Sequence, residues 1–169
     1  MAEPLTPEIM NSWTRNKLPG LLGIVITAVE PGRVSGRLPV RPDLIAGNGA
    51  LWAPAIVGLA DTLCAYGVST VWPDGAAGFT TVELKCNFMG TLQSGAVACV
   101  AEKLHGGRTT QVWDATLTNE ESGKLLAAFR CTQIILYPRP GRARISRKSI
   151  HALRQPADGT KVLWADSRL

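Results

Sequence analysis

The chain has 169 residues, 46% of them hydrophobic and 18% charged, which fits one globular domain with a short appendage and excludes a disordered chain or a fibre. Its formal charge of +5 is unevenly placed: residues 138–169 hold eight of the 18 basic and two of the 13 acidic residues, a local net charge of +6 that leaves −1 for the rest. Because prolines break the last predicted strand where this segment begins, we divide the chain into a nearly neutral domain, 1–137, and a basic C-terminal extension, 138–169.

The cysteine and histidine pattern argues against a metal or dithiol site. The four cysteines are widely spaced, and neither histidine has a cysteine or a second histidine at ligand spacing. We therefore expect buried free thiols in a reducing cytoplasm, and no metal. The N-terminus has no basic stretch followed by an apolar core, and the phosphate-loop, dinucleotide-binding and nucleophile-elbow motifs are missing.

The first third of the chain predicts a short helix and a β-hairpin. A Thr-Pro-Glu sequence suits the start of a helix over about 6–17, and the Pro-Gly pair at 19–20 is expected to end it. Two β-rich runs follow, 23–29 and 33–40, with a Pro-Gly turn between them. A loop over 41–51 completes this part.

The next segment is unusually apolar. Between Asp43 and Asp74 the only charged residue is Asp61, and Pro54 suits the first turn of a helix that is apolar on every side. Such a helix must be enclosed by protein or by lipid. An aspartate in the middle of a bilayer costs about 2.5–3.5 kcal/mol, so we predict a helix wrapped by a sheet rather than a membrane span.

Four strand-like runs follow this helix, joined by segments with turn chemistry. They are rich in Val, Thr, Ile and Cys and cover residues 79–89, 96–103, 109–118 and 125–137. The last three are close enough in sequence to form a meander. We therefore expect an α+β fold in which an antiparallel sheet of five or six strands curves around one long apolar helix.

Asp61 is the residue in this helix that requires an explanation. A carboxylate among apolar side chains must be paired, hydrogen-bonded or protonated, because burial disfavours its charged form. General bases and carboxylate nucleophiles occupy sites of this kind. The residues alone leave two interpretations open: Asp61 is a functional carboxylate, or it is a structural one that forms hydrogen bonds with the backbone or with a partner subunit.

The order of several motifs resembles the hotdog-fold acyl-CoA thioesterases, specifically the phenylacetate-pathway (PaaI-like) branch of the 4-hydroxybenzoyl-CoA thioesterase superfamily. The similarity covers roughly residues 15–137 and is carried by Leu59-Ala60-Asp61-Thr62, 79–89, Gly95 with 104–108, and 123–127. It implies a curved sheet around a central helix, an acyl-CoA substrate and no cofactor. It also implies homodimers, or homotetramers built as dimers of dimers, with active sites at the dimer interface. Independently of the resemblance, we expect neither a membrane nor a nucleic-acid partner.

The resemblance also assigns catalytic roles. The family's acidic base or nucleophile falls on Asp61, and the amide that polarises the thioester carbonyl falls on Ala53. A helix N-terminus supports that second role, because its free amides and dipole favour a developing oxyanion. The hydroxyl that holds the attacking water falls on Thr81, with Thr80 as the alternative if the strand register differs by one residue.

The start of the helix departs from the family pattern. Where the family has His-Gly-Gly, this chain has Trp52-Ala53-Pro54, so the histidine is missing and Pro54 has no amide hydrogen. Trp52 could line an acyl pocket or pack in the dimer core. Asn48 is in the loop that carries a family asparagine, and Arg108 is assigned to the phosphates of coenzyme A.

The leading prediction is therefore hydrolysis of an acyl-CoA to a carboxylic acid and coenzyme A. The missing histidine leaves a second reading, a non-catalytic hotdog protein that binds or senses acyl-CoA. A third reading, nucleic-acid binding through the basic extension, predicts affinity that falls steeply with salt.

Overall fold

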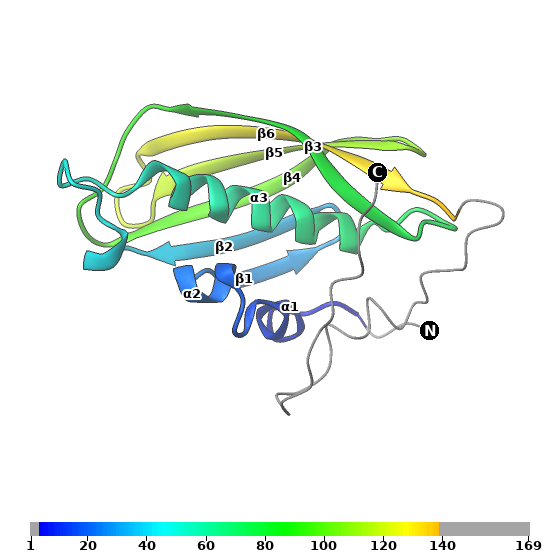
Figure 1. Ribbon diagram of the computed structural model, residues 1–169, viewed down its shortest axis with the longest axis horizontal. Helices are drawn as coiled ribbons and strands as arrows, with labels where there is room; N and C mark the ends of the chain where they lie inside the picture. Colours follow the sequence, from blue (N-terminus) through cyan, green and yellow to red (C-terminus); the bar gives the residue numbers. More distant parts are fainter. Residues whose placement is uncertain (1–3, 139–169) are drawn as a thin grey trace, which may run out of the picture.

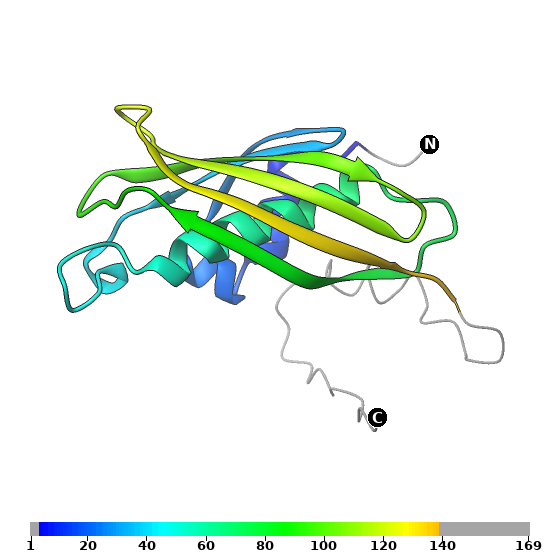
Figure 2. The same ribbon diagram turned by 90° about the horizontal axis from the view of Figure 1, so that it is seen from above.

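The structure, a computed structural model, describes residues 4–138, and the predicted basic extension lies outside the described residues except for its first residue. Its main feature is a curved antiparallel sheet of six strands in the order β1-β2-β4-β5-β6-β3, with a long helix, α3, along its concave face (Figures 1 and 2). The strands are β1 (Val25–Glu30), β2 (Arg33–Pro39), β3 (Gly78–Phe88), β4 (Ala96–Gly106), β5 (Thr110–Asn119) and β6 (Leu125–Leu136). This arrangement confirms the predicted hotdog fold, including the β4-β5-β6 meander.

Helix α3 (Ala53–Thr70) packs its apolar side chains into the concave face of the sheet. Pro54 lies in its first turn, as predicted, and Leu59 and Leu63 are fully buried. At Gly67 the helix comes so close to the sheet that an added Cβ would lie 2.4 Å from the ring of the fully buried Trp113. One face of the apolar helix is thus covered by the sheet, and no helix among residues 4–138 is long and apolar enough to cross a membrane.

The N-terminal helix prediction was correct at its start and wrong at its end. Thr6 caps α1 (Pro7–Thr14) by accepting a hydrogen bond from the Ile9 amide at 3.3 Å, but the helix ends before Asn16, whose φ of 58° is left-handed. A second short helix, α2 (Leu18–Leu22), then follows. The expected stop at 19–20 is wrong because Pro19 occupies the first turn of α2, where a missing amide hydrogen has no cost.

The two edges of the sheet differ in how they are protected. At the β1 edge, the Asn11 side chain of α1 donates to the Ile26 carbonyl at 2.9 Å and accepts from the Ile26 amide at 2.8 Å, so it occupies outward-pointing backbone groups. At the other edge, β3 has no further strand beside it among the described residues, and several of its apolar side chains are exposed. An unprotected strand of 11 residues is a template for pairing with another chain.

Candidate active site

Asp61 and Thr81 face each other across the space between α3 and β3. The Thr81 hydroxyl oxygen lies 3.4 Å from Asp61 Oδ1, and both residues are partly buried. Burial raises the pKa of the Asp61 carboxyl, and this effect is larger than the lowering that a hydrogen bond donated by Thr81 would cause. A carboxylate with a raised pKa is a stronger base than an ordinary surface aspartate, which suits proton transfer near neutral pH.

The strand register selects between the two candidate threonines. Thr81 pairs with Gln133 of β6, whose side chain points to the inner face of the sheet. Thr80 alternates to the outer face, where its exposed hydroxyl approaches only the Thr81 carbonyl, at 3.5 Å. The structure therefore brings Thr81, and not Thr80, to Asp61.

Gln133 is a third polar residue at this position, and the sequence analysis did not find it. Its side chain is 0% exposed, and its Oε1 lies 3.1 Å from the Thr81 hydroxyl oxygen. Its Nε2 donates to Cys131 Sγ at 3.4 Å. The available signal was its place in the apolar alternation of β6, where it follows Phe129 and Cys131 at every second position.

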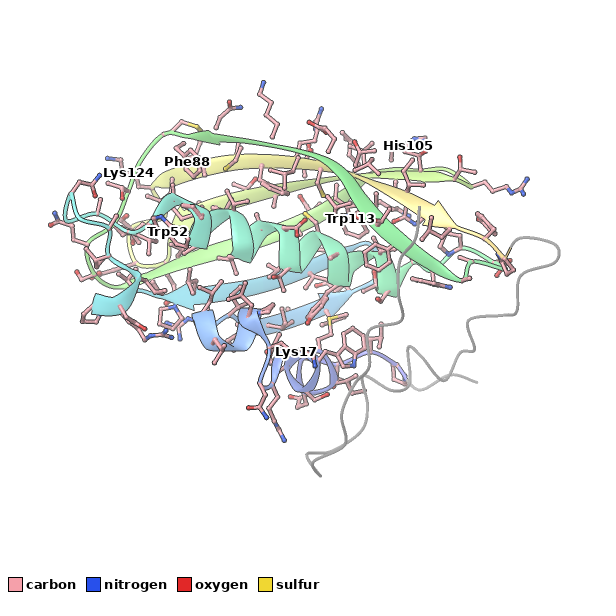
Figure 3. The ribbon with its side chains drawn as sticks, in the orientation of Figure 1. Lys17, Trp52, Phe88, His105, Trp113 and Lys124 are labelled. Carbon is pink, nitrogen blue, oxygen red and sulfur yellow. The ribbon has the colours of Figure 1, made fainter. Side chains whose placement is uncertain are left out.

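The start of α3 borders an apolar hollow of about 390 Å³ between the 46–54 segment and the end of β3. Asn48, Trp52, Ala53 and Phe88 all line it, and Figure 3 shows Trp52 and Phe88 at the same end of the molecule. Trp52 is 51% exposed, so it does not pack in the core of this chain. The Asn48 side chain accepts a hydrogen bond from the Ala50 amide at 3.1 Å and thereby holds its own loop.

The helix start presents a free amide, that of Ala53, to this hollow. Trp52, the N-cap residue, provides no side-chain cap, and no acceptor among the described residues takes the Ala53 N–H. Pro54 has no N–H, and the Ala55 amide donates to the Trp52 carbonyl at 2.9 Å. Ala53 is therefore a donor available to an oxyanion here.

Arg108 lies away from these groups in the single chain. It stands in the β4–β5 hairpin, where its guanidinium group lies 5.3 Å from the centre of the Tyr137 ring and its carbonyl accepts from the Tyr137 hydroxyl at 2.6 Å. Figure 3 places His105, of the same hairpin, at the opposite end of the molecule from Trp52. One chain thus does not bring Arg108 to the hollow beside Ala53.

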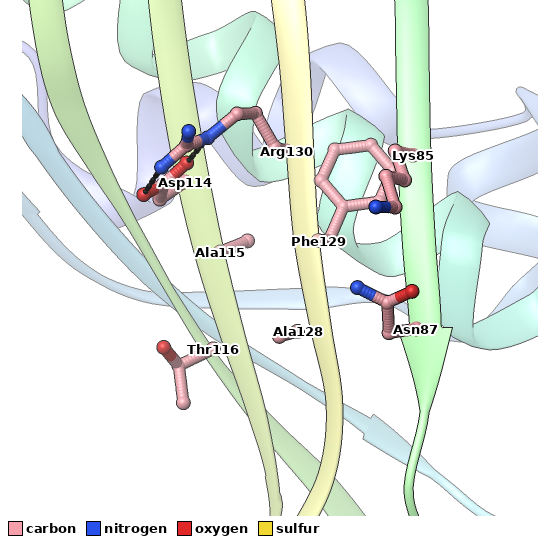
Figure 4. Close-up of a pocket in the computed structure, with 8 residues that line it drawn as sticks. All are labelled: Lys85, Asn87, Asp114, Ala115, Thr116, Ala128, Phe129 and Arg130. Carbon is pink, nitrogen blue, oxygen red and sulfur yellow. Dashed lines mark hydrogen bonds and ion pairs between the residues drawn. The ribbon is translucent and has the colours of Figure 1, made fainter.

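A second, more polar hollow of about 270 Å³ lies on the outer face of the sheet (Figure 4). Lys85 and Asn87 project over it from β3, and Arg130 of β6 is held by Asp114 in an ion pair, with its Nη2 2.6 Å from Asp114 Oδ2. Asp61 lies on the inner face, so this hollow contains none of the predicted site residues.

Sequence comparisons identify the family. Residues 48–126 match the family model described as the thioesterase superfamily. A 1,4-dihydroxy-2-naphthoyl-CoA hydrolase from Listeria monocytogenes is 33% identical over 66% of this chain and 89% of its own length. A putative esterase from Vibrio cholerae is 30% identical over 84% of this chain and 93% of its own length. The chain belongs to the thioesterase superfamily.

A solved structure agrees with this assignment. A mutant thioesterase from Pseudomonas aeruginosa superposes with a TM-score of 0.74 at 29% identity, covering 79% of this chain and 96% of its own. Like its relatives, this thioesterase is a hydrolase that acts on thioesters. Membership of the superfamily therefore favours catalysis over the reading of a protein that only binds its ligand.

Proposed function

We propose that this thioesterase hydrolyses an acyl-CoA, with Asp61 as the catalytic carboxylate. The observation that carries the proposal is the carboxylate itself: it lies in an apolar helix, its pKa is raised by burial, and Thr81 faces it from the open edge of the sheet. The name of the Listeria relative supports a coenzyme A thioester as the substrate class. Four free cysteines suit the reducing cytoplasm in which acyl-CoA is used.

Two routes use the same carboxylate. As a general base, Asp61 takes a proton from water while the water oxygen bonds to the thioester carbonyl carbon, with Thr81 orienting that water. As a nucleophile, Asp61 bonds to the carbonyl carbon and water then hydrolyses the mixed anhydride. In both routes the carbon–sulfur bond breaks, the thiolate leaves and is protonated, and the products are a carboxylic acid and coenzyme A.

The Ala53 amide is proposed to hold the oxyanion. It is a free donor at the positive end of an 18-residue helix, where negative charge is stabilised. The adjoining apolar hollow, with Trp52 in its wall and Asn48 at its loop, is proposed to take the acyl group. Arg108 remains the proposed contact for the phosphates of coenzyme A.

We further propose that the active site is shared between two copies of the chain. Ala53 and Asp61 are eight residues apart on one helix, about 12 Å along its axis, which is too far for both to act on one carbonyl group. The open β3 edge, with Val82 55%, Leu84 45% and Phe88 48% exposed, offers the surface for a second copy. Such a homodimer, alone or paired into a tetramer, would bring one chain's Asp61 to its partner's helix start.

The catalytic assignment is tested with Asp61→Asn. Thiol release from a panel of aliphatic and aromatic acyl-CoAs is measured for the wild type and the variant. We expect the variant to lose at least about 100-fold in kcat, because an amide can neither accept the water proton nor form the anhydride. Comparable rates for the two proteins would remove Asp61 from the mechanism.

The oxyanion assignment is tested with Ala53→Pro. Proline is favoured at the first position of a helix, and the preceding Trp52 already has the extended ψ of 120° that proline requires, so the fold should be retained while the N–H is lost. Loss of one oxyanion donor costs about 100- to 1000-fold in kcat. Ala53→Gly, which keeps the amide, is the matched control and should remain active.

The shared site is tested by mixing the two inactive variants. If Asp61 of one chain acts with Ala53 of its partner, each dimer of Asp61→Asn with Ala53→Pro contains one intact site and one doubly defective site. Random exchange of subunits should then restore about one quarter of the wild-type rate, since half the dimers are mixed and half their sites are intact. No recovery after verified exchange would contradict a site shared in this way.

A further inference from the structure

Gln133 competes with Asp61 for the single hydroxyl proton of Thr81. The Thr81 hydroxyl has a single proton and faces two acceptor oxygens, Gln133 Oε1 at 3.1 Å and Asp61 Oδ1 at 3.4 Å. The nitrogen end of the Gln133 amide is directed to Cys131 Sγ, so its oxygen end is the one that faces Thr81. The shorter contact and the buried position of the amide both favour Gln133 as the acceptor.

We propose that Gln133 is a positioning residue that holds the Thr81 proton away from Asp61, so that Thr81 presents a hydrogen-bond acceptor to the reacting water. Gln133 itself touches neither substrate nor water in this scheme; it acts through Thr81. The inference rests on the proposed function and adds to it the direction of the hydrogen bond at the catalytic carboxylate.

The direction of this hydrogen bond decides how strong a base Asp61 is. A Thr81 proton donated to the carboxylate would stabilise its charged form and weaken it as a base. When Thr81 donates its proton in a hydrogen bond to Gln133, the lone pairs of the Thr81 hydroxyl are free to accept one hydrogen of a water molecule, while Asp61 accepts the other. The water oxygen is then directed at the carbonyl carbon, and Asp61 keeps the proton affinity that burial gives it.

The other titratable groups beside Asp61 do not take over the effect of the Thr81–Gln133 hydrogen bond on the basicity of Asp61. The thiols of Cys64, on α3, and Cys131, on β6, interact electrostatically with Asp61, and both are fully buried. The interaction with Cys131, together with burial, raises the pKa of Cys64 well above its ordinary value, so this thiol stays neutral. Glu83 of β3 points to the outer face, where the Thr132 hydroxyl donates to it at 3.4 Å.

The test measures the Asp61 titration directly, by carbon-detected NMR of its carboxyl group. In Gln133→Met the freed Thr81 proton turns to Asp61, and the titration midpoint should fall by about one pH unit. Thr81→Val alone should leave the midpoint nearly unchanged, and the double variant should titrate like Thr81→Val. Gln111→Met is the matched control, because Gln111 is equally buried but bonds to the Trp113 indole instead.

The activity of the same variants gives a second readout. Gln133→Met should lower kcat with little change in KM, and the acidic limb of its pH–rate profile should move to lower pH with the NMR midpoint. An unchanged or raised midpoint in Gln133→Met overturns the proposal, as does a midpoint about one pH unit higher in Thr81→Val, since that result would show Thr81 donating to Asp61 in the wild type. The NMR result needs no turnover, so failure of every acyl-CoA as a substrate would defeat the proposed function separately.

Discussion

The close contact between α3 and the sheet makes Gly67→Ala a sharp test of the fold. An added Cβ would lie 2.4, 2.5 and 3.0 Å from three ring atoms of Trp113, which is 0% exposed. Its indole N–H is also held by Gln111 Oε1 at 3.0 Å, so the ring cannot withdraw without losing a buried hydrogen bond. The helix or the strand beneath it must therefore move.

The net change in unfolding free energy caused by Gly67→Ala is the sum of two opposing contributions. Overpacking of this severity costs about 3 kcal/mol, and replacing glycine by alanine inside a helix returns about 1 kcal/mol. We expect the free energy of unfolding to fall by about 2 kcal/mol and Tm by about 5–8 °C. Urea and thermal denaturation, followed by circular dichroism at one protein concentration, measure both quantities.

Gly58→Ala is the matched control on the same helix. A Cβ at Gly58 would meet only Leu22 Cδ1, at 3.2 Å, the end of a side chain that can rotate. The helix-propensity gain should therefore dominate, and this variant should be about 0.5–1 kcal/mol more stable than the wild type. If Gly67→Ala were as stable as Gly58→Ala, the tight packing of α3 on Trp113 would be wrong.

Asp61→Asn should be more stable than the wild type at neutral pH. Because burial raises the folded-state pKa of Asp61, its contribution to stability is present at low pH and is lost as pH rises through that pKa. Urea denaturation at several pH values should therefore show that the difference in unfolding free energy between variant and wild type increases with pH. Asn11→Ala leaves the Ile26 amide and carbonyl without partners and should cost about 1–3 kcal/mol of unfolding free energy, more than Asn11→Asp, which keeps the acceptor. Val82→Lys places a charge at the β3 edge and should convert the proposed dimers to monomers with loss of hydrolysis; light scattering that still finds dimers would place the interface elsewhere.

The fold was predictable because its signals are local or strongly periodic. The apolar helix with Pro54 in its first turn and the turn-separated strands of the meander were evident from residue order, and the structure confirms them. The break at 19–20 was misjudged because proline is equally suited to ending one helix and to beginning the next.

The site was only partly predictable because it depends on contacts between distant strands. Thr80 and Thr81 could not be separated from the sequence, since a β-bulge next to Thr81 and the pairing of β3 with β6 decide which one faces inward. Gln133 was missed for the same reason: it lies 52 residues from Thr81 and looks like one polar residue in an apolar strand. Roles that came from family resemblance, such as that of Arg108, remain predictions.

The replacement of His-Gly-Gly by Trp52-Ala53-Pro54 changes how the oxyanion can be held. A helix start normally offers several free amides, but Pro54 has none and the Ala55 amide is already bonded to the Trp52 carbonyl, so the first turn has fewer N–H donors for the proposed oxyanion, with that of Ala53 among them. A site with fewer oxyanion donors depends more on its base, because less of the barrier is removed by charge stabilisation. In such a site, the proposed hydrogen bond from Thr81 to Gln133 has a direct benefit: it preserves the basicity of Asp61, the proposed base that would compensate for the smaller number of donors at the helix start.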